Sequence, residues 1–66
     1  MAQMTVQIQC KQDDGNWRGE VMRVNAFSAF LAAKAKALIT GKTYRLVDSE
    51  GQIIEVVSHK ELPKRL

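Results

Sequence analysis

One segment of the sequence constrains the fold more than any other. Residues 26–41, AFSAFLAAKAKALITG, have the composition of a helix but almost no polar side. Asn25 precedes the segment as an N-cap and Gly41 follows it as a left-handed C-cap, which predicts a helix from about Ala26 to Ile39 or Thr40. In a chain of 66 residues with no second helical segment, strands must supply the surface that this helix covers.

Four segments around the helix have the pattern of strands. Residues 4–11 alternate strictly between apolar and polar side chains, and residues 17–24 return after the turn DDGN. Residues 42–48 and 52–58 form a second pair, joined by the turn DSEG. A β-bulge at Gly19 would shift the register of the second strand and bring the preceding tryptophan to the inner face.

The order hairpin, helix, hairpin predicts a single α+β domain over residues 1–58, followed by a charged tail at 59–66. We expect a ββαββ arrangement, a four-stranded sheet with one helix packed on one face. Whether the third strand lies beside the first or the second stays open. Alternation and helical spacing predict a core made of Val6, Ile8, Met22, Val24, Phe27, Leu31, Leu38, Tyr44, Leu46, Ile54 and Val56.

The helix carries two apolar strips, which raises the question of what covers the second. The strip expected to face the sheet consists of Phe27, Leu31, Leu38 and Ile39. The strip expected to face outward consists of Phe30, Ala33 and Ala37, with Lys34 between the two. Two interpretations stay open: alanine is simply the best helix former, or small residues let a partner approach, with Phe30 as the anchor.

The outer face of the sheet is also expected to be apolar. If Tyr44, Leu46, Ile54 and Val56 face the helix, strand parity turns Val47, Ile53 and Val57 outward. Two apolar strips on so small a protein suggest a contact surface. The predicted partner-binding residues are Phe30, Ala33, Lys34, Ala37, Val47, Ile53 and Val57.

Catalytic and metal-binding motifs are absent from the sequence. One cysteine, Cys10, and one histidine, His59, make no recognisable zinc pattern and allow no internal disulfide. The carboxylates at 13, 14, 48 and 50 fall in turns, where aspartate serves local hydrogen bonding. We therefore expect a protein that is not an enzyme and has no cofactor. The start of the chain lacks the features of a signal peptide, which favours a soluble, cytoplasmic protein.

Nucleic-acid binding is the alternative to protein binding. The net charge of +3 and the pI near 9.4 permit an anionic partner. An open sheet face can hold single-stranded bases on aromatic side chains with basic residues around them, although an aromatic platform is missing from the expected outer face. The residues predicted for this alternative are Lys11, Arg23, Arg45, Lys60, Lys64 and Arg65.

The hairpin-helix-hairpin plan on a small basic chain is similar in size and layout to several phage-encoded host-takeover and anti-defence proteins. No motif matches any of them residue by residue. The likeness in layout implies a virus-encoded inhibitor or adaptor of a host protein or complex. The expected partner is another protein, either a second copy in a homodimer or a heterologous target, and no membrane is involved.

Overall fold

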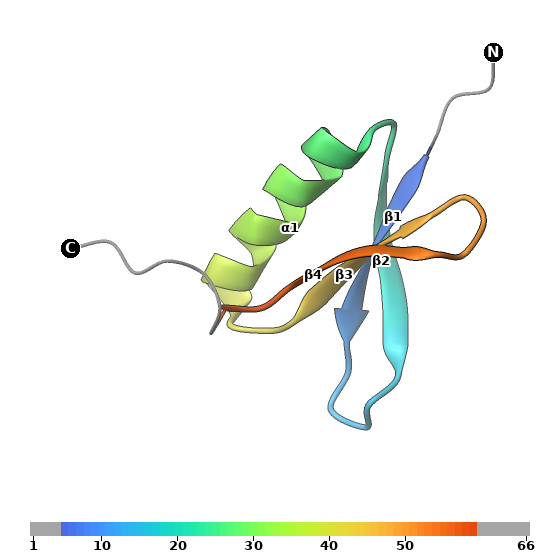
Figure 1. Ribbon diagram of the computed structural model, residues 1–66. Helices are drawn as coiled ribbons and strands as arrows, with labels where there is room; N and C mark the ends of the chain where they lie inside the picture. The colour runs from blue at the N-terminus through green and yellow to red at the C-terminus, as the bar shows by residue number, and fades with distance from the viewer. Residues whose placement is uncertain (1–4, 60–66) are drawn as a thin grey trace, which may run out of the picture.

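The computed structural model describes residues 5–59, which form four strands and one helix (Figure 1). The elements, in chain order, are β1 (Val6–Lys11), β2 (Trp17–Arg23), α1 (Ala26–Thr40), β3 (Tyr44–Asp48) and β4 (Ile53–Val57). The predicted α+β class and the ββαββ order of elements are confirmed.

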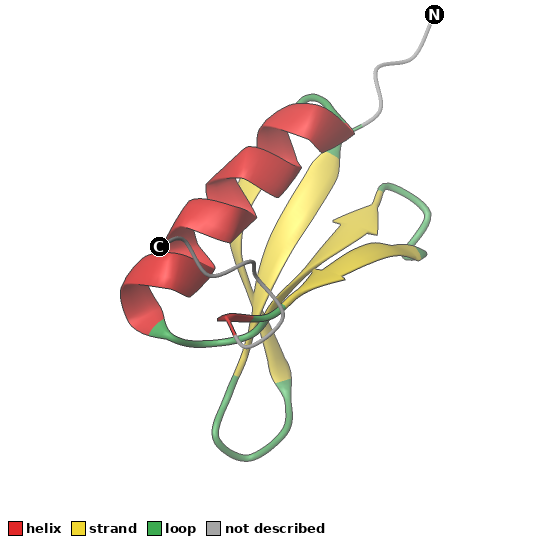
Figure 2. Cartoon of the chain, turned by 60° about the vertical axis from the view of Figure 1, so that its left-hand side comes forward, coloured by secondary structure: helices red, strands yellow, loops and turns green. Residues whose placement is uncertain are grey.

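The four strands form one antiparallel sheet in the order β2-β1-β3-β4. This order settles the question left by the sequence, because β3 pairs with β1 and not with β2. Since β2 and β3 both run antiparallel to β1, they are parallel to each other, and α1 is the crossover between them. Figure 2 shows α1 along one side of the sheet, while no other described element covers the opposite side.

Local sequence signals place the ends of the elements. The side chain of Asn25 accepts a hydrogen bond of 2.7 Å from the amide of Ser28, and Gly41 ends the helix with a φ of 76°. In the second hairpin the carboxylate of Asp48 accepts 2.9 Å hydrogen bonds from the amides of Glu50 and Gln52. Both predicted helix caps and the predicted turn are therefore confirmed.

A β-bulge in β2 decides which of its side chains face the helix. Ile8 pairs with Val21 and Gln9 pairs with Gly19, which leaves Glu20 as the extra residue. Trp17 pairs with Lys11, on the face away from α1, so the expectation that a bulge brings Trp17 inward is wrong. Val21, rather than Met22 or Val24, packs against the core.

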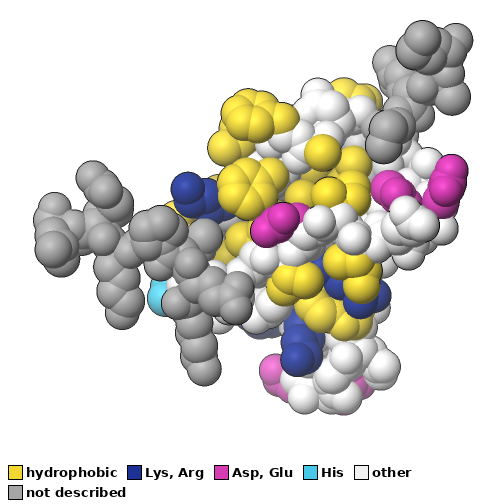
Figure 3. Space-filling model, in the orientation of Figure 1, with side chains coloured by type: hydrophobic (Ala, Val, Ile, Leu, Met, Phe, Trp, Pro, Cys, Tyr) yellow, Lys and Arg dark blue, Asp and Glu magenta, His cyan; other side chains and the backbone are white. Residues whose placement is uncertain are grey.

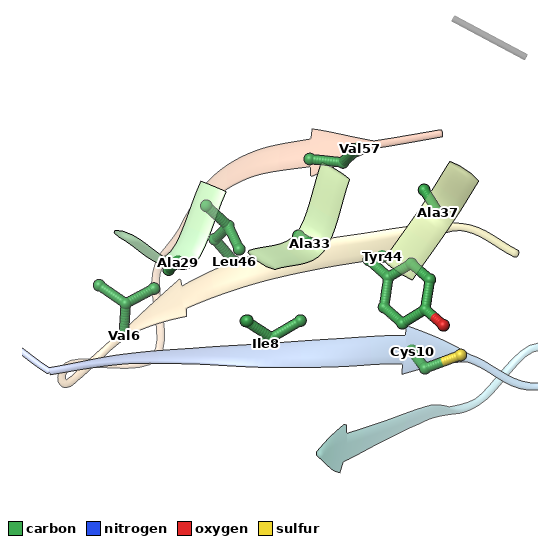
Figure 4. Close-up of a cluster of buried hydrophobic side chains, with 9 residues drawn as sticks. All are labelled: Val6, Ile8, Cys10, Ala29, Ala33, Ala37, Tyr44, Leu46 and Val57. Carbon is green, nitrogen blue, oxygen red and sulfur yellow. The ribbon is translucent and has the colours of Figure 1, made fainter. Parts of the chain in front are cut away.

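The core lies between α1 and the sheet and is built from large strand residues and small helix residues (Figure 4). The strands contribute Val6, Ile8, Cys10, Tyr44, Leu46 and Val57. The helix contributes Ala29, Ala33 and Ala37, each with no exposed surface. These alanines are spaced by four residues, so they form one continuous row that lets α1 lie close to the sheet.

This core corrects the sequence prediction in part. Val6, Ile8, Tyr44 and Leu46 are buried as expected, but the other predicted core members are exposed: Met22, Val24, Phe27, Leu31, Leu38, Ile54 and Val56. On the helix the reason is volume. Ile8, Tyr44 and Leu46 already fill the space above the sheet, and only alanine fits between them and the helix axis.

In β4 the predicted core residues are exposed because of where the strand lies in the sheet. The strand is at the edge of the sheet, and its register with β3 shifts between Glu55 and Ile53, which leaves Ile54 without a partner. Val57 pairs with Tyr44 and faces the core, whereas Val56 pairs with Arg45 on the open face.

Candidate functional site

The outer face of α1 is the most exposed apolar surface of the described chain. Phe27 is 73% exposed, Leu31 49%, Leu38 52% and Ile39 83%. Figure 3 shows hydrophobic side chains gathered over the helix. We call Phe27, Leu31, Lys34 and Leu38 the outer stripe, because their spacing of four, three and four residues places them along one side of the helix.

The outer stripe lies on the exposed side of the helix, away from the alanines of the core. At 100° per residue, the row from Ala29 to Ala37 centres about 130° from the middle of the outer stripe. The helix is therefore apolar on both faces, with small residues inside and large residues outside. A large apolar side chain left in water forgoes roughly 1.5–3 kcal/mol of burial, so a row of them marks a surface that a partner can cover.

Only two charged residues lie on α1, and both are lysines. Lys36 lies on the flank toward β2, where its Nζ is 3.3 Å from Oε1 of Glu20. Lys34 is half-buried and lies within the outer stripe, between Leu31 and Leu38. Because the helix has no carboxylate, its outer face is apolar with one positive charge, that of Lys34.

The structure moves most of the predicted partner-binding residues to other places. Ala33 and Ala37 are fully buried beneath the helix, so the expectation that they form an outward strip is wrong. Phe30 is half-buried against the core at the flank of α1. Because the alanine side of α1 packs on the sheet, Phe27 and the rest of the outer stripe are exposed to solvent instead.

The predicted outer sheet residues are also divided. Val57 is buried under α1, which contradicts the prediction. Val47 pairs with Gln7 on the open face, as expected, but neighbouring side chains bury it. Ile53 is exposed, as expected. These three residues therefore do not form a contact strip.

The open face of the sheet is covered by a chain of its own polar side chains. The guanidinium carbon of Arg45 lies 4.3 Å from the centre of the Trp17 ring, and Nε of Arg45 donates a 2.6 Å hydrogen bond to Oε1 of Gln9. Nε2 of Gln9 in turn donates a 2.8 Å bond to Oε1 of Gln7. The Gln7 amide lies over Gly19, at the place where a Cβ would stand.

This polar chain distinguishes the open sheet face from the helix face. Its members come from β2, β1 and β3, and the contacts among them engage the polar groups of these side chains. The exposed apolar residues of the sheet lie mainly at its two edges: Met22 on β2, and Ile53, Ile54 and Val56 on β4. These polar side chains thus cover the centre of the open face, whereas no described element covers the outer stripe.

The residues predicted for nucleic-acid binding do not all meet. Lys11 and Arg45 share the open face, with Trp17 beside them. Arg23 pairs with the buried Val6, which places it on the helix side, so it does not join them. The remaining three, Lys60, Lys64 and Arg65, lie outside the described residues.

Among the described residues, the titratable side chain with a perturbed pKa is Tyr44. Burial raises the pKa of its hydroxyl above 10.0, although a hydrogen bond to Thr40 opposes the shift. Its oxygen lies 3.0 Å from Oγ1 of Thr40, which ties the C-terminal end of α1 to β3. This phenol is part of the core.

Over residues 5–59, no group of three or more His, Cys, Asp or Glu side chains is arranged to hold a metal ion. Within the same range, no helix has the length and apolar content needed to cross a membrane. No protein-family model, curated protein or solved structure matches the chain.

Proposed function

We propose that this chain is a small protein-binding module and that it acts by contact through the outer stripe of α1. The proposal rests on one observation about which residues the helix buries. Its alanines fill the core, while Phe27, Leu31 and Leu38 are about half to three quarters exposed. Aromatic and large aliphatic side chains at helical spacing are the usual anchors where a helix docks on a partner.

The electrostatics of α1 agree with a protein partner. Charged residues are depleted at the centres of protein interfaces, and the three central apolar residues of the stripe have a single charge, Lys34, beside them. The stem of Lys34 can lie along an apolar partner while its ammonium stays in water. The surface on which the proposal rests thus consists of apolar side chains and not of titratable ones, so the proposed role is not enzymatic.

The same proposal includes the finer assignments made from the sequence. An inhibitor or adaptor needs a rigid scaffold that presents one surface, and a four-stranded sheet under a close-packed helix supplies one. We propose a cytoplasmic protein of this kind, encoded by a virus and directed at a host protein or complex.

Photo-crosslinking tests where the partner binds. The photoreactive residue p-benzoylphenylalanine replaces Phe27 in one variant and Trp17 in the other, and both are irradiated in cells. The first replacement keeps an aromatic ring on the outer stripe, and the second places the same probe on the open sheet face. The expected result is a protein adduct from position 27. Adducts from position 17 alone, or from neither position, would contradict the proposal.

The second candidate function, nucleic-acid binding, is favoured by one specific observation. Trp17, Arg45 and Lys11 come together on the open face, so an aromatic ring lies beside two cations after all. An indole stacked on a guanidinium can accept a base of single-stranded nucleic acid on its free side. However, Arg45 already occupies one side of the ring and is hydrogen-bonded to Gln9, which leaves a small platform.

A fluorescence anisotropy titration with single- and double-stranded oligonucleotides decides this candidate. If it is right, affinity falls steeply with salt, and charge reversal at Arg45 and Lys11 abolishes binding. Charge reversal at Arg23, which lies on the other face, is the matched control and should have a smaller effect. Absence of binding at low salt would eliminate this function.

A further inference from the structure

We infer that, when no other protein is bound, the occupant of the outer stripe is a second copy of the chain, and that two copies pair antiparallel through α1 about a two-fold axis. The inference rests on the proposed function, since it names the partner for the same surface. It requires that the stripe be complementary to itself, because in a two-fold interface residue i contacts residue j and residue j contacts residue i.

The spacing of the outer stripe meets this requirement. Positions 27, 31, 34 and 38 are symmetric about the point between 32 and 33. An antiparallel pair centred there places Phe27 against Leu38 of the partner copy and Leu31 against Lys34. Steps of four, three and four residues are also the spacing at which two helices interdigitate along one seam.

The charges on the helix favour the antiparallel pair over a parallel one. A parallel pair would place Lys34 directly against its own copy, and α1 has no carboxylate to separate the two. In the antiparallel pair each Lys34 lies against Leu31, where its stem packs on the leucine and its ammonium reaches water. The opposed helix dipoles add a small favourable contribution.

The available area fits a weak dimer. The exposed parts of Phe27, Leu31 and Leu38 amount to roughly 300 Å² per copy, so that a pair buries roughly 600 Å² of apolar surface before polar margins are counted. Specific interfaces bury about 1,200–2,000 Å² in total, and those below this range are transient. The expected assembly is therefore a reversible dimer that forms with rising concentration.

The second surface on which two copies could meet is the edge strand β4, and it is the weaker candidate. A two-fold pair centred on Glu55 would set this carboxylate against its own copy in the middle of the strand. The bulge at Ile54 also interrupts the regular hydrogen bonding that an added strand needs. Ile54 therefore provides the control position.

Sedimentation velocity over a wide range of concentration tests the inference, with circular dichroism as the check on folding. The wild type should move toward twice the monomer mass as concentration rises. Phe27→Glu should weaken the dimer at least about tenfold, because the new carboxylate lies against Leu38. Ile54→Glu, which places the same charge on another exposed apolar residue, should leave the dissociation constant within about threefold of wild type.

The variant Leu31→Glu distinguishes the antiparallel pair from other arrangements. In the antiparallel pair each new carboxylate lies against Lys34 of the partner copy, so the dimer should persist and become sensitive to salt. In a parallel pair the same change would set glutamate against glutamate and dissociate the assembly. A dimer that Phe27→Glu and Leu31→Glu both destroy, or that Phe27→Glu leaves unchanged, would overturn the inference.

A monomeric wild type at every concentration would also overturn the inference, but it would not decide the proposed function. In that case a heterologous adduct from position 27 in the crosslinking experiment would show that the stripe binds another protein. Absence of both the dimer and the adduct would eliminate the two together.

Discussion

The two faces of α1 differ in a way that neither hydrophobicity nor helix propensity explains. The inner face is a row of three alanines with no exposed surface, while the outer face holds the large side chains of Phe27, Leu31 and Leu38. A helix of a free-standing domain would place its largest apolar residues inside, where each is worth the most. The reverse arrangement indicates that the sheet determines which residues the helix can bury, and it is the basis of the contact proposed for the outer face.

The sheet shows why the inner face needs small residues. Below α1 lie Ile8, Tyr44 and Leu46, the largest fully buried side chains on the two central strands. Protein interiors are close-packed, so large residues on one layer require small residues on the facing layer. The outer face has no facing layer in the described chain. Matched substitutions on the two faces should therefore differ in their effect on stability.

The largest difference is expected between two leucines. Leu46→Ala should lower the free energy of unfolding by about 2–5 kcal/mol, because this side chain is buried under the helix and its loss leaves a cavity. Leu38→Ala, the same change on the outer face, should cost less than about 1 kcal/mol in dilute monomer. Urea denaturation of both variants measures the difference. Equal losses would show that the outer face is packed after all.

The next difference is expected between two alanines on the helix. Ala33→Leu adds volume to a filled core and should destabilise the protein by about 1–3 kcal/mol. Ala35→Leu adds the same volume to an exposed position and should change stability by less than about 0.5 kcal/mol. Thermal unfolding of the two variants makes the comparison. If Ala33→Leu is tolerated as well as Ala35→Leu, the inner row is not close-packed.

A smaller effect is expected at the flank between the two faces. Lys36→Ala removes the ion pair with Glu20, both of whose side chains are partly exposed to solvent. The loss should be about 0.2–1 kcal/mol and should shrink further in high salt. Urea denaturation at low and high salt measures it, with Lys34→Ala as the control on the same helix. A large loss that is independent of salt would assign Lys36 a packing role instead.

The smallest effect at neutral pH concerns Tyr44 under the C-terminal end of α1. Burial raises the pKa of its hydroxyl in the folded protein above 10.0, so both states hold the proton at neutral pH and stability is unaffected. As pH rises past 10 the unfolded chain ionises first, and stability should fall through the folded-state pKa. Thermal unfolding between pH 8 and pH 11 tests this, and Tyr44→Phe should remove this part of the loss.

The sequence predicted the element boundaries well because local chemistry sets them. Asn25 and Gly41 are caps whose preference depends on backbone groups one turn away, and Asp48 holds its turn through hydrogen bonds to its next neighbours. Strict alternation likewise identified the inner residues Val6 and Ile8 of β1. None of these signals depends on how distant parts of the chain meet.

The orientation of α1 and the exposure of β4 could not be predicted, because each depends on distant contacts. Both strips of the helix are apolar, and the choice between them requires knowing that Tyr44 and Leu46 lie beneath it. The sequence of β4 is more apolar than that of β1, yet β4 is exposed because strand order places it at the edge.

The candidate site was missed for the same reason. The sequence pattern predicts an outward strip of Phe30, Ala33 and Ala37, but the structure buries the two alanines fully and Phe30 in part. The row Ala29, Ala33 and Ala37, with its constant step of four, was the available signal: it marks the side on which a helix can approach another layer closely. The misplacement of Trp17 follows from that of Met22: the bulge at Glu20 puts the two on one face, but that face is the open one, because Val21 and not Met22 packs on the core.

Thiol labelling at two positions of α1 shows which face of the helix is buried. Leu31→Cys places a thiol on the outer stripe and Ala33→Cys places one in the inner row, while Cys10, which is 1% exposed, is an internal control in both proteins. In dilute native protein the thiol at position 31 should react quickly. The thiol at position 33 and Cys10 should react only when denaturant opens the fold. A thiol at position 33 that reacts as fast as the one at position 31, or faster, would contradict the account, because the large apolar face of α1 would then be the inner one.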